Sequence, residues 1–204
     1  MDIVVFGAGG RAGRRAVAEA RKRGHRVTPV VRDPARHDLR DAVAGDATDA
    51  ASIAKAAAGH DAAISTAVDL AADARGFFAG ASRALDTGLT RAGVRRLVVA
   101  GLASILPGSS GIPLMDEPGY PNEYRAFYLG HAAGLQALRD GTLDWAYIAP
   151  SGDFDHDGAP TGRYQVADHA DRDAGITYED FAIALVDEAE APRHHRTALS
   201  VRRP

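Results

Sequence analysis

Glycine recurs at short intervals near the N-terminus, in the stretch Gly7-Ala8-Gly9-Gly10-Arg11-Ala12-Gly13. The stretch follows a hydrophobic run, residues 2–6, and precedes a segment of helical length, residues 11–23. Glycines in this context let the backbone turn sharply and approach a pyrophosphate, which the free N–H groups of the helix start attract. The spacing therefore predicts a dinucleotide-binding turn, whose contact residues are Gly7, Gly9, Gly10, Arg11, Ala12 and Gly13.

The second predicted strand ends in Val30-Val31-Arg32-Asp33. Dinucleotide-binding folds specific for NAD place an acid near this point, where it accepts from the ribose 2′-hydroxyl. Arg32 stands there instead, and a guanidinium can hold a 2′-phosphate in a bidentate pair. We therefore predict that NADP(H) is preferred over NAD(H), provided that Asp33 faces away, for example by capping the turn before Pro34. The alternative is that Arg32 is a solvated strand end.

Further residues follow or end the other predicted strands. In a parallel sheet these positions share the carboxyl edge, where ligands of open α/β folds bind. We expect cofactor contacts from Asp46, Ala47, Thr66, Ala67, Gly101 and Pro150, and we expect Asp49 to cap the helix that follows it.

Short β-branched runs alternate with Ala-rich and Arg-rich segments along most of the chain. Such βαβ repeats predict an α/β fold, a Rossmann-type doubly wound parallel sheet with a small C-terminal lobe. We predict a single domain over residues 1–204, with a core over 1–150 and the lobe over 151–204. Residues 105–121, rich in Pro and Gly, are predicted to form a long loop.

Composition excludes several classes of function. The net charge of −3 gives no electrostatic footprint for nucleic acid, and the lack of Cys removes thiol chemistry and Cys-ligated metals. No run approaches about 18 apolar residues, so we predict no membrane partner and a cytoplasmic protein. Residues 153–158 match half of a calcium loop, but position twelve is Tyr164 rather than Glu, so no metal site is predicted.

The motifs GAGGRAG, VVRDP, GDATD, AAISTA and LVVAG, in this order, resemble the atypical short-chain dehydrogenases and reductases. The chain is most similar to the NmrA-like NAD(P)H-binding group, which includes NADH-flavin reductases and biliverdin-IXβ reductases. LDWAYIAPSGDF, TGRYQV and ITYEDFAIALVDEAEAPRH extend the resemblance over nearly the whole chain. It implies a Rossmann-type domain that binds NADP, with the C-terminal lobe over the nicotinamide.

Lysine occurs only at Lys22 and Lys55, and neither follows a tyrosine at the spacing Tyr-x-x-x-Lys. The proton-donating dyad of standard short-chain dehydrogenases is therefore absent, which disfavours conventional carbonyl–alcohol chemistry. Reduction of a flavin or quinone-like acceptor depends mainly on stacking and orientation and remains open.

Position and resemblance suggest the remaining site residues. We predict Ser104, Tyr124 and His131 as catalytic candidates and Tyr120 and Phe154 as substrate contacts, with ordinary loop or packing roles as the alternative for each. The expected partner is a small acceptor of the flavin or quinone kind, for a monomer or homodimer. Two other hypotheses stay open: a non-catalytic NADP sensor of the NmrA type, and a specialised biosynthetic reductase.

Overall fold

The structure, a computed structural model, describes residues 1–204 and contains one large sheet. Eight strands pair in the order β3-β2-β1-β4-β5-β6-β10-β8, all parallel except β8 beside β10. Their bounds are β1 Asp2–Phe6, β2 Arg26–Val31, β3 Val43–Ala44, β4 Ala62–Ser65, β5 Arg96–Ala100, β6 Asp144–Pro150, β8 Gln165–Ala167 and β10 Thr197–Arg202. A second, two-stranded sheet pairs β7 (Asp153–Phe154) with β9 (Gly175–Ile176).

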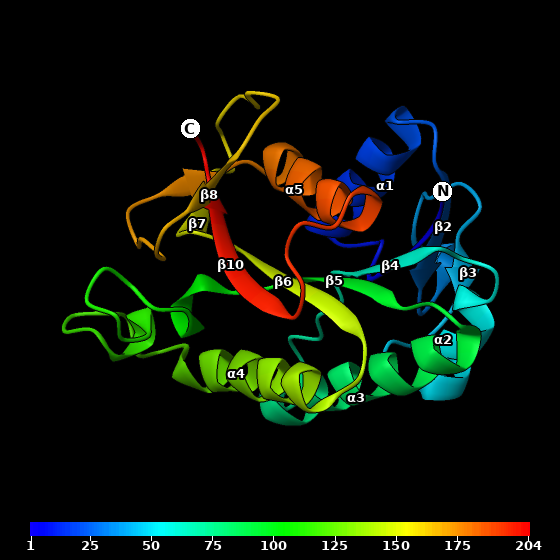
Figure 1. Ribbon diagram of the computed structural model, residues 1–204, viewed down its shortest axis with the longest axis horizontal. Helices are drawn as coiled ribbons and strands as arrows, with labels where there is room; N and C mark the ends of the chain where they lie inside the picture. The colour runs from blue at the N-terminus through cyan, green and yellow to red at the C-terminus, as the bar shows by residue number, and fades with distance from the viewer.

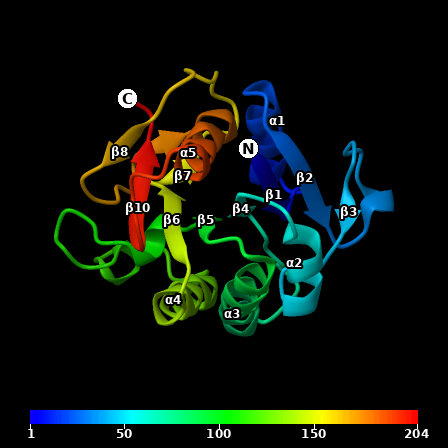
Figure 2. The same ribbon diagram turned by 45° about the vertical axis from the view of Figure 1, so that its right-hand side comes forward.

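Helices cover both faces of the large sheet (Figures 1 and 2). Helices α1 (Arg11–Lys22) and α5 (Tyr178–Glu190) pack side by side on one face, and α2 (Ala50–Ala57), α3 (Ala74–Ala92) and α4 (Arg125–Asp140) lie on the other. Three short 3₁₀ helices complete the chain: η1 (Pro34–Arg36), η2 (Ala103–Ile105) and η3 (Leu114–Asp116). This arrangement confirms the predicted Rossmann-type fold.

The strands are continuous apolar runs because both of their faces are buried. In β1, Val4 and Phe6 pack toward α2, α3 and α4, whereas Ile3 and Val5 pack toward α1 and α5. The predicted cap at Asp49 is confirmed: its carboxylate accepts from the Ala51 amide at 2.9 Å at the start of α2.

The segment after residue 150 is less separate than the lobe expected over residues 151–204. Strand β10 extends the large sheet beside β6, and α5 packs against α1. A strand there covers the edge that β6 would otherwise leave unpaired. Within this segment, β7, β9 and the loops around them lie outside the layers that the sheet and helices form (Figure 1).

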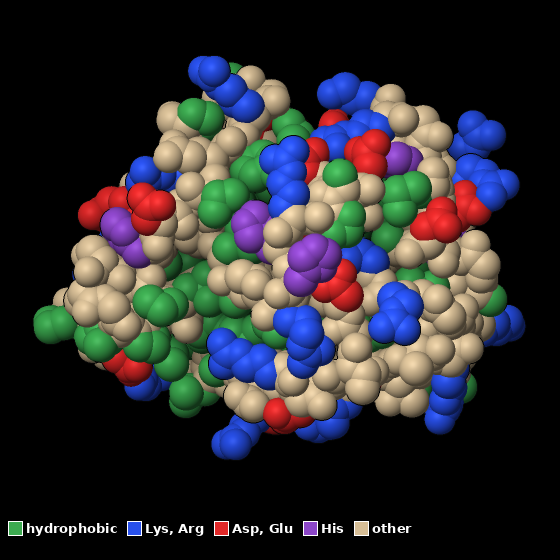
Figure 3. Space-filling view, in the orientation of Figure 1, with side chains coloured by type: hydrophobic (Ala, Val, Ile, Leu, Met, Phe, Trp, Pro, Cys, Tyr) green, Lys and Arg blue, Asp and Glu red, His purple; other side chains and the backbone are tan.

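The strand order changes direction at β1, which lies between β2 and β4. In open α/β sheets the crevice beyond the carboxyl ends of such neighbouring strands is where ligands bind. On the face drawn in Figure 3, Lys and Arg side chains are spread among acidic ones rather than gathered in one patch. None of the helices combines the length and apolar character needed to cross a membrane.

Candidate functional site

The glycine turn connects β1 to α1 with a geometry that side chains would prevent. Gly7 has a φ of +75°, and a Cβ atom there would lie 2.6 Å from the amide nitrogen of Ala67. A Cβ atom at Gly13 would collide with the Gly7 carbonyl oxygen, and one at Gly9 would lie 2.5 Å from the His37 ring. Gly10 is different, because a Cβ there would meet only the Gly7 oxygen, at 3.4 Å. Gly7 and Gly13 are thus required by the backbone around them, whereas at Gly9 only the movable His37 side chain stands in the way.

Helix α1 begins without a side-chain cap and with no acidic residue in its first turn. Its first hydrogen bond runs from the Arg14 amide to the Gly10 carbonyl, at 3.0 Å. The amides of Arg11, Ala12 and Gly13 precede that bond, so they are free to bind an anion at the positive end of the helix dipole. The predicted pyrophosphate contacts therefore lie together, and the residues fit a dinucleotide.

A cavity of about 260 Å³ opens beside this turn. Eight of the predicted cofactor residues line it, together with seven others: Phe6, Val30, Val31, His37, Gly45, Val68 and Phe77. The predicted ones are Gly7, Gly9, Gly10, Arg32, Asp46, Ala47, Thr66 and Ala67. Five predicted residues are not part of its lining: Arg11, Ala12, Gly13, Gly101 and Pro150. Gly101 packs against the Tyr147 ring, and Pro150 is buried at the end of β6.

Two positively charged or protonatable groups face this cavity, Arg32 and His37. The Arg32 side chain is 65% exposed, and its Nη1 donates to Oδ2 of Asp69 at 2.5 Å. Asp69 lies on the loop after β4, and this hydrogen bond is the main reason that the pKa of Asp69 falls below its usual value. Arg32 is thus held at the rim of the cavity by an acid from a neighbouring loop.

Asp33, next to Arg32, and Asp46, in the cavity lining, both use their carboxylates in local hydrogen bonds. The Asp33 carboxylate accepts from the Ala35 amide at 3.1 Å and caps η1, as the Arg32 hypothesis requires. Asp46 Oδ1 accepts from both the amide and the hydroxyl of Thr48, at 2.8 Å and 2.7 Å. The carboxylate of Asp46 is therefore engaged within its own turn.

Two hydroxyl groups meet beyond the carboxyl end of β5. Ser104 is on η2, and its Oγ lies 2.8 Å from the phenolic oxygen of Tyr120, in the long loop after that helix. Ser104 is 4% exposed, whereas Tyr120 is half-buried and packs edge-on against Tyr128. The two predicted residues form a pair in which only the tyrosine side is accessible.

His131 lies behind this pair, inside the protein. Its Nδ1 is 2.9 Å from the hydroxyl of Tyr147, and its ring is in contact with Phe78 and Phe127. Burial lowers the pKa of His131 to about 3, so its ring is neutral at physiological pH. The expectation that His131 faces the substrate is therefore not met, because it is 7% exposed and bonded to a buried strand residue.

The comparisons with known proteins agree with this geometry. A family described as NAD(P)H-binding matches residues 7–192. The chain belongs to this family. The match begins at Gly7 and extends through α5, so it covers both the nucleotide half and the C-terminal segment, and it indicates a nicotinamide cofactor.

Three relatives show how far the likeness extends. YwnB of Bacillus subtilis (strain 168), a protein of uncharacterised function, is 32% identical over 209 residues, 98% of each chain. A Burkholderia pseudomallei protein provisionally named as exported is 36% identical and superposes with a TM-score of 0.87 over 99% of each chain. SP1627 of Streptococcus pneumoniae TIGR4, provisionally named an NADH-flavin reductase, is 30% identical, with a TM-score of 0.86 over 100% of each chain.

Two predicted site residues lie apart from Ser104 and Tyr120. Tyr124 is 63% exposed just before α4, and its side chain makes no hydrogen bond. Phe154 stacks on Tyr178 of α5 at a centroid distance of 3.8 Å, on the opposite face of the sheet from α4. No hydrogen bond or ring contact joins either residue to Ser104 or Tyr120.

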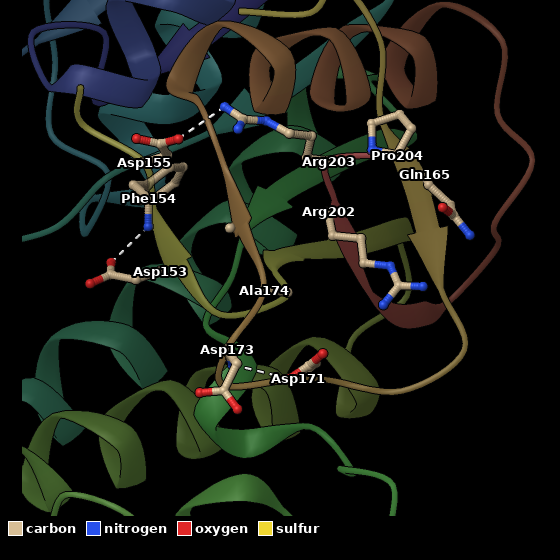
Figure 4. Close-up of a pocket in the computed structure, with 11 residues that line it drawn as sticks. Asp153, Phe154, Asp155, Gln165, Asp171, Asp173, Ala174, Arg202, Arg203 and Pro204 are labelled. Carbon is tan, nitrogen blue, oxygen red and sulfur yellow. Dashed lines mark hydrogen bonds and ion pairs between the residues drawn. The ribbon is translucent and has the colours of Figure 1, made fainter. Parts of the chain in front are cut away.

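A second cavity, of about 630 Å³, lies between the small sheet and the end of β10 (Figure 4). Asp155 pairs with Arg203 across it at 2.9 Å, and Asp153, Asp171 and Asp173 also line it. Asp155, which belongs to the rejected calcium motif, thus already has an arginine partner. Phe154 lines this cavity rather than the nucleotide cavity.

The sequence missed two residues that shape the hydroxyl site. Tyr147 carries a hydroxyl group within a strand whose other residues are mostly apolar and buried. A polar group in such a strand needs a hydrogen-bond partner, and this could have pointed to the residue. Arg172, on the loop before β9, donates to the Gly119 carbonyl at 2.8 Å, and its guanidinium carbon lies 5.5 Å from the Tyr120 ring centroid. No pattern in the sequence connects Arg172 to residue 120.

Proposed function

We propose that the protein is an NADPH-dependent reductase that transfers hydride to a flat conjugated acceptor of the flavin or quinone kind. The observation that carries the proposal is the position of the Ser104–Tyr120 pair, at the same carboxyl edge of the sheet as the dinucleotide cradle. A cofactor bound at the glycine turn extends along this edge toward β5 and β6. The acceptor would then bind between the nicotinamide and Tyr120.

The absence of a tyrosine–lysine dyad agrees with this acceptor class. Lys22 lies at the end of α1 and Lys55 on α2, and neither residue lines the nucleotide cavity. Flat acceptors accept hydride into an electron-poor ring, so that stacking and orientation contribute to catalysis and a tyrosine–lysine dyad is not required. The name of SP1627 supports a reductase, although that name specifies NADH.

The preference for NADPH rests on the charges at the cavity rim. Arg32 lies at the end of β2, where the ribose of a bound dinucleotide is held, and His37 is beside it. Two other acids of this region, Asp33 and Asp46, have their carboxylates engaged in local turns. A 2′-phosphate would therefore meet a guanidinium without a carboxylate that points at it, apart from Asp69, which already pairs with Arg32.

The remaining roles follow from the same arrangement. The amides of residues 11–13 hold the pyrophosphate, and Thr66 fixes the turn because its hydroxyl donates to the carbonyl oxygens of Phe6 and Gly7. The bound cofactor supplies the hydride. Ser104 and Tyr120 orient the acceptor, and the loop that carries Tyr120 shields it from water.

Purified protein mixed with NADPH and either FMN or naphthoquinone tests the proposal, with the loss of NADPH absorbance as the readout. The expected result is oxidation of NADPH that depends on one of these acceptors. Tight NADPH binding without oxidation by either acceptor would contradict the reductase and favour the NADP sensor or an enzyme with a narrower substrate.

A further inference from the structure

Tyr120 is the accessible member of a polar group built from three separate segments. Ser104 comes from η2, Tyr120 from the loop before α4, and Arg172 from the loop before β9. Because Ser104 is buried and has only Tyr120 as a hydrogen-bond partner, its hydroxyl can donate to the phenolic oxygen. The O–H group of Tyr120 is then free to donate to a ligand.

The loops that carry these residues are tied to each other. The Arg172 guanidinium donates to the carbonyl of Gly119, and the amide of Ala170 donates to the Pro107 carbonyl at 2.9 Å. The guanidinium also lies over the Tyr120 ring, so the position of the ring is fixed from two sides. A cation beside a phenol and a hydroxyl that donates to its oxygen both stabilise negative charge on that oxygen.

We propose that Tyr120 donates a proton to an oxygen of the acceptor, with Ser104 and Arg172 as its positioning residues, and that the acceptor is therefore a quinone or conjugated carbonyl rather than a flavin. The inference rests on the proposed function and specifies its acceptor. The Tyr120 O–H bond breaks and the proton bonds to the acceptor oxygen, as the acceptor gains a hydride and NADPH is oxidised. The phenolate then takes a proton from water.

The acceptor class follows from where the proton goes. A quinone gains a hydride and must gain a proton on oxygen to become a hydroquinone, so an acid at that oxygen lowers the barrier. A flavin accepts its hydride at a ring nitrogen and depends less on such an acid. The guanidinium of Arg172 supplies the cation that no lysine supplies in this chain.

Binding without turnover tests the contact itself. Naphthoquinone and naphthalene, titrated by calorimetry into the protein loaded with oxidised NADP, differ only in the oxygens. Tyr120→Phe should lower the affinity for naphthoquinone by roughly three- to tenfold, the contribution of one hydrogen bond, and leave the affinity for naphthalene unchanged. Tyr164→Phe is the matched control, because the Tyr164 hydroxyl bonds Asp187 of α5 on the opposite face of the sheet. Equal affinities for naphthoquinone in the two variants would overturn the contact.

Kinetics test the proton transfer. Tyr120→Phe should lower kcat for naphthoquinone by about 10²- to 10⁴-fold, the usual worth of a general acid, and change FMN reduction by less than about threefold. Arg172→Gln should lower kcat in the same direction, and Arg172→Lys should restore part of it because the charge is kept. Arg83→Gln serves as the control, since Arg83 is exposed on α3 and has no partner.

The outcomes separate the inference from the proposed function. An unchanged kcat for naphthoquinone in Tyr120→Phe overturns the proton transfer while the reductase stands. Equal losses with FMN and naphthoquinone overturn the assignment of the acceptor class. A wild-type protein that oxidises NADPH with neither acceptor contradicts both the reductase and the proton transfer, and the calorimetric titration then decides whether Tyr120 contacts the ligand.

Discussion

The hydroxyl of Tyr147 links His131 to the end of β5. It lies 2.9 Å from His131 Nδ1 and accepts from the Leu102 amide at 2.9 Å. Since the His131 ring is neutral, only one of its two nitrogens carries a proton, and Nδ1 shares a hydrogen bond with the Tyr147 hydroxyl. Leu102 directly precedes η2, so this buried chain of hydrogen bonds anchors the helix that carries Ser104.

The burial of His131 predicts a specific loss of stability in acid. The unfolded chain binds a proton at His131 below its ordinary pKa of 6.5, but the folded protein does not until about pH 3. The contribution of His131 to stability is therefore full above pH 6.5 and falls progressively as the pH drops toward 3. Between pH 6.5 and about pH 5 the loss should be about 1.5 kcal/mol.

Urea unfolding of the wild type and of His131→Asn at several pH values measures this loss. The Asn side chain can still accept from Tyr147 but does not titrate, so the variant should show a flatter pH dependence over that range. His169→Asn is the control, because the His169 side chain is exposed and unpaired. Parallel pH profiles for the wild type and His131→Asn would show that the buried imidazole is not responsible.

Arg32 should decide between the two nicotinamide cofactors. Arg32→Glu should weaken NADPH relative to NADH by roughly ten- to hundredfold, because a charge-assisted bond to the 2′-phosphate is lost and a carboxylate is introduced. Fluorescence titration with both reduced cofactors measures the ratio of their Kd values, with Arg83→Glu as a matched charge reversal on α3. An equal loss for both cofactors would contradict the contact with the 2′-phosphate.

Asp69 should oppose the same contact. It pairs with Arg32 at 2.5 Å, so a 2′-phosphate must share the guanidinium with it. Asp69→Asn should tighten the binding of NADPH by roughly two- to fivefold, which is the scale of an exposed ion pair. The affinity for NADH should not change. The same fluorescence titration provides the measurement. Weaker NADPH binding would instead show that Asp69 holds Arg32 in its binding position.

Helices, strands and turns could be predicted from the sequence where residues close together in the chain specify them. The glycine turn, the alternation of strands and helices, and the caps at Asp33 and Asp49 depend on residues close in the chain. The position of β10 beside β6 depends on which strand edge stays open after the other strands have paired, which no local pattern encodes.

The candidate site shows the same division. The residues around the glycine turn share one cavity because each follows a strand end. The Ser104–Tyr120 pair and its Arg172 neighbour come from loops whose paths are set by packing. Local patterns therefore predict separate roles for Ser104 and Tyr120 and no role for Arg172. Position and resemblance predict His131 as a site residue, yet it is buried against Phe78 and Phe127.

Alanine substitutions at two glycines of the turn should affect the free energy of unfolding and the cofactor affinity differently, because the two glycines have different surroundings. A methyl group at Gly13 would collide with the Gly7 carbonyl, so Gly13→Ala should lower both the free energy of unfolding and NADPH affinity. At Gly10 φ is −75° and the nearest atom to a Cβ is 3.4 Å away. Gly10→Ala should therefore change stability by less than about 0.5 kcal/mol.

The cofactor, however, must approach Gly10 closely, because this residue begins the helix whose amides bind the pyrophosphate. Gly10→Ala should accordingly weaken NADPH and NADH alike, by at least about tenfold, in the fluorescence titration. Gly80→Ala is the control. Gly80 lies inside α3 with open space around its Cβ position, so the substitution should raise the free energy of unfolding by about 0.5 to 1 kcal/mol without changing binding. Unchanged affinity in Gly10→Ala would contradict a pyrophosphate at the start of α1, because a methyl group would then fit where the phosphates are expected.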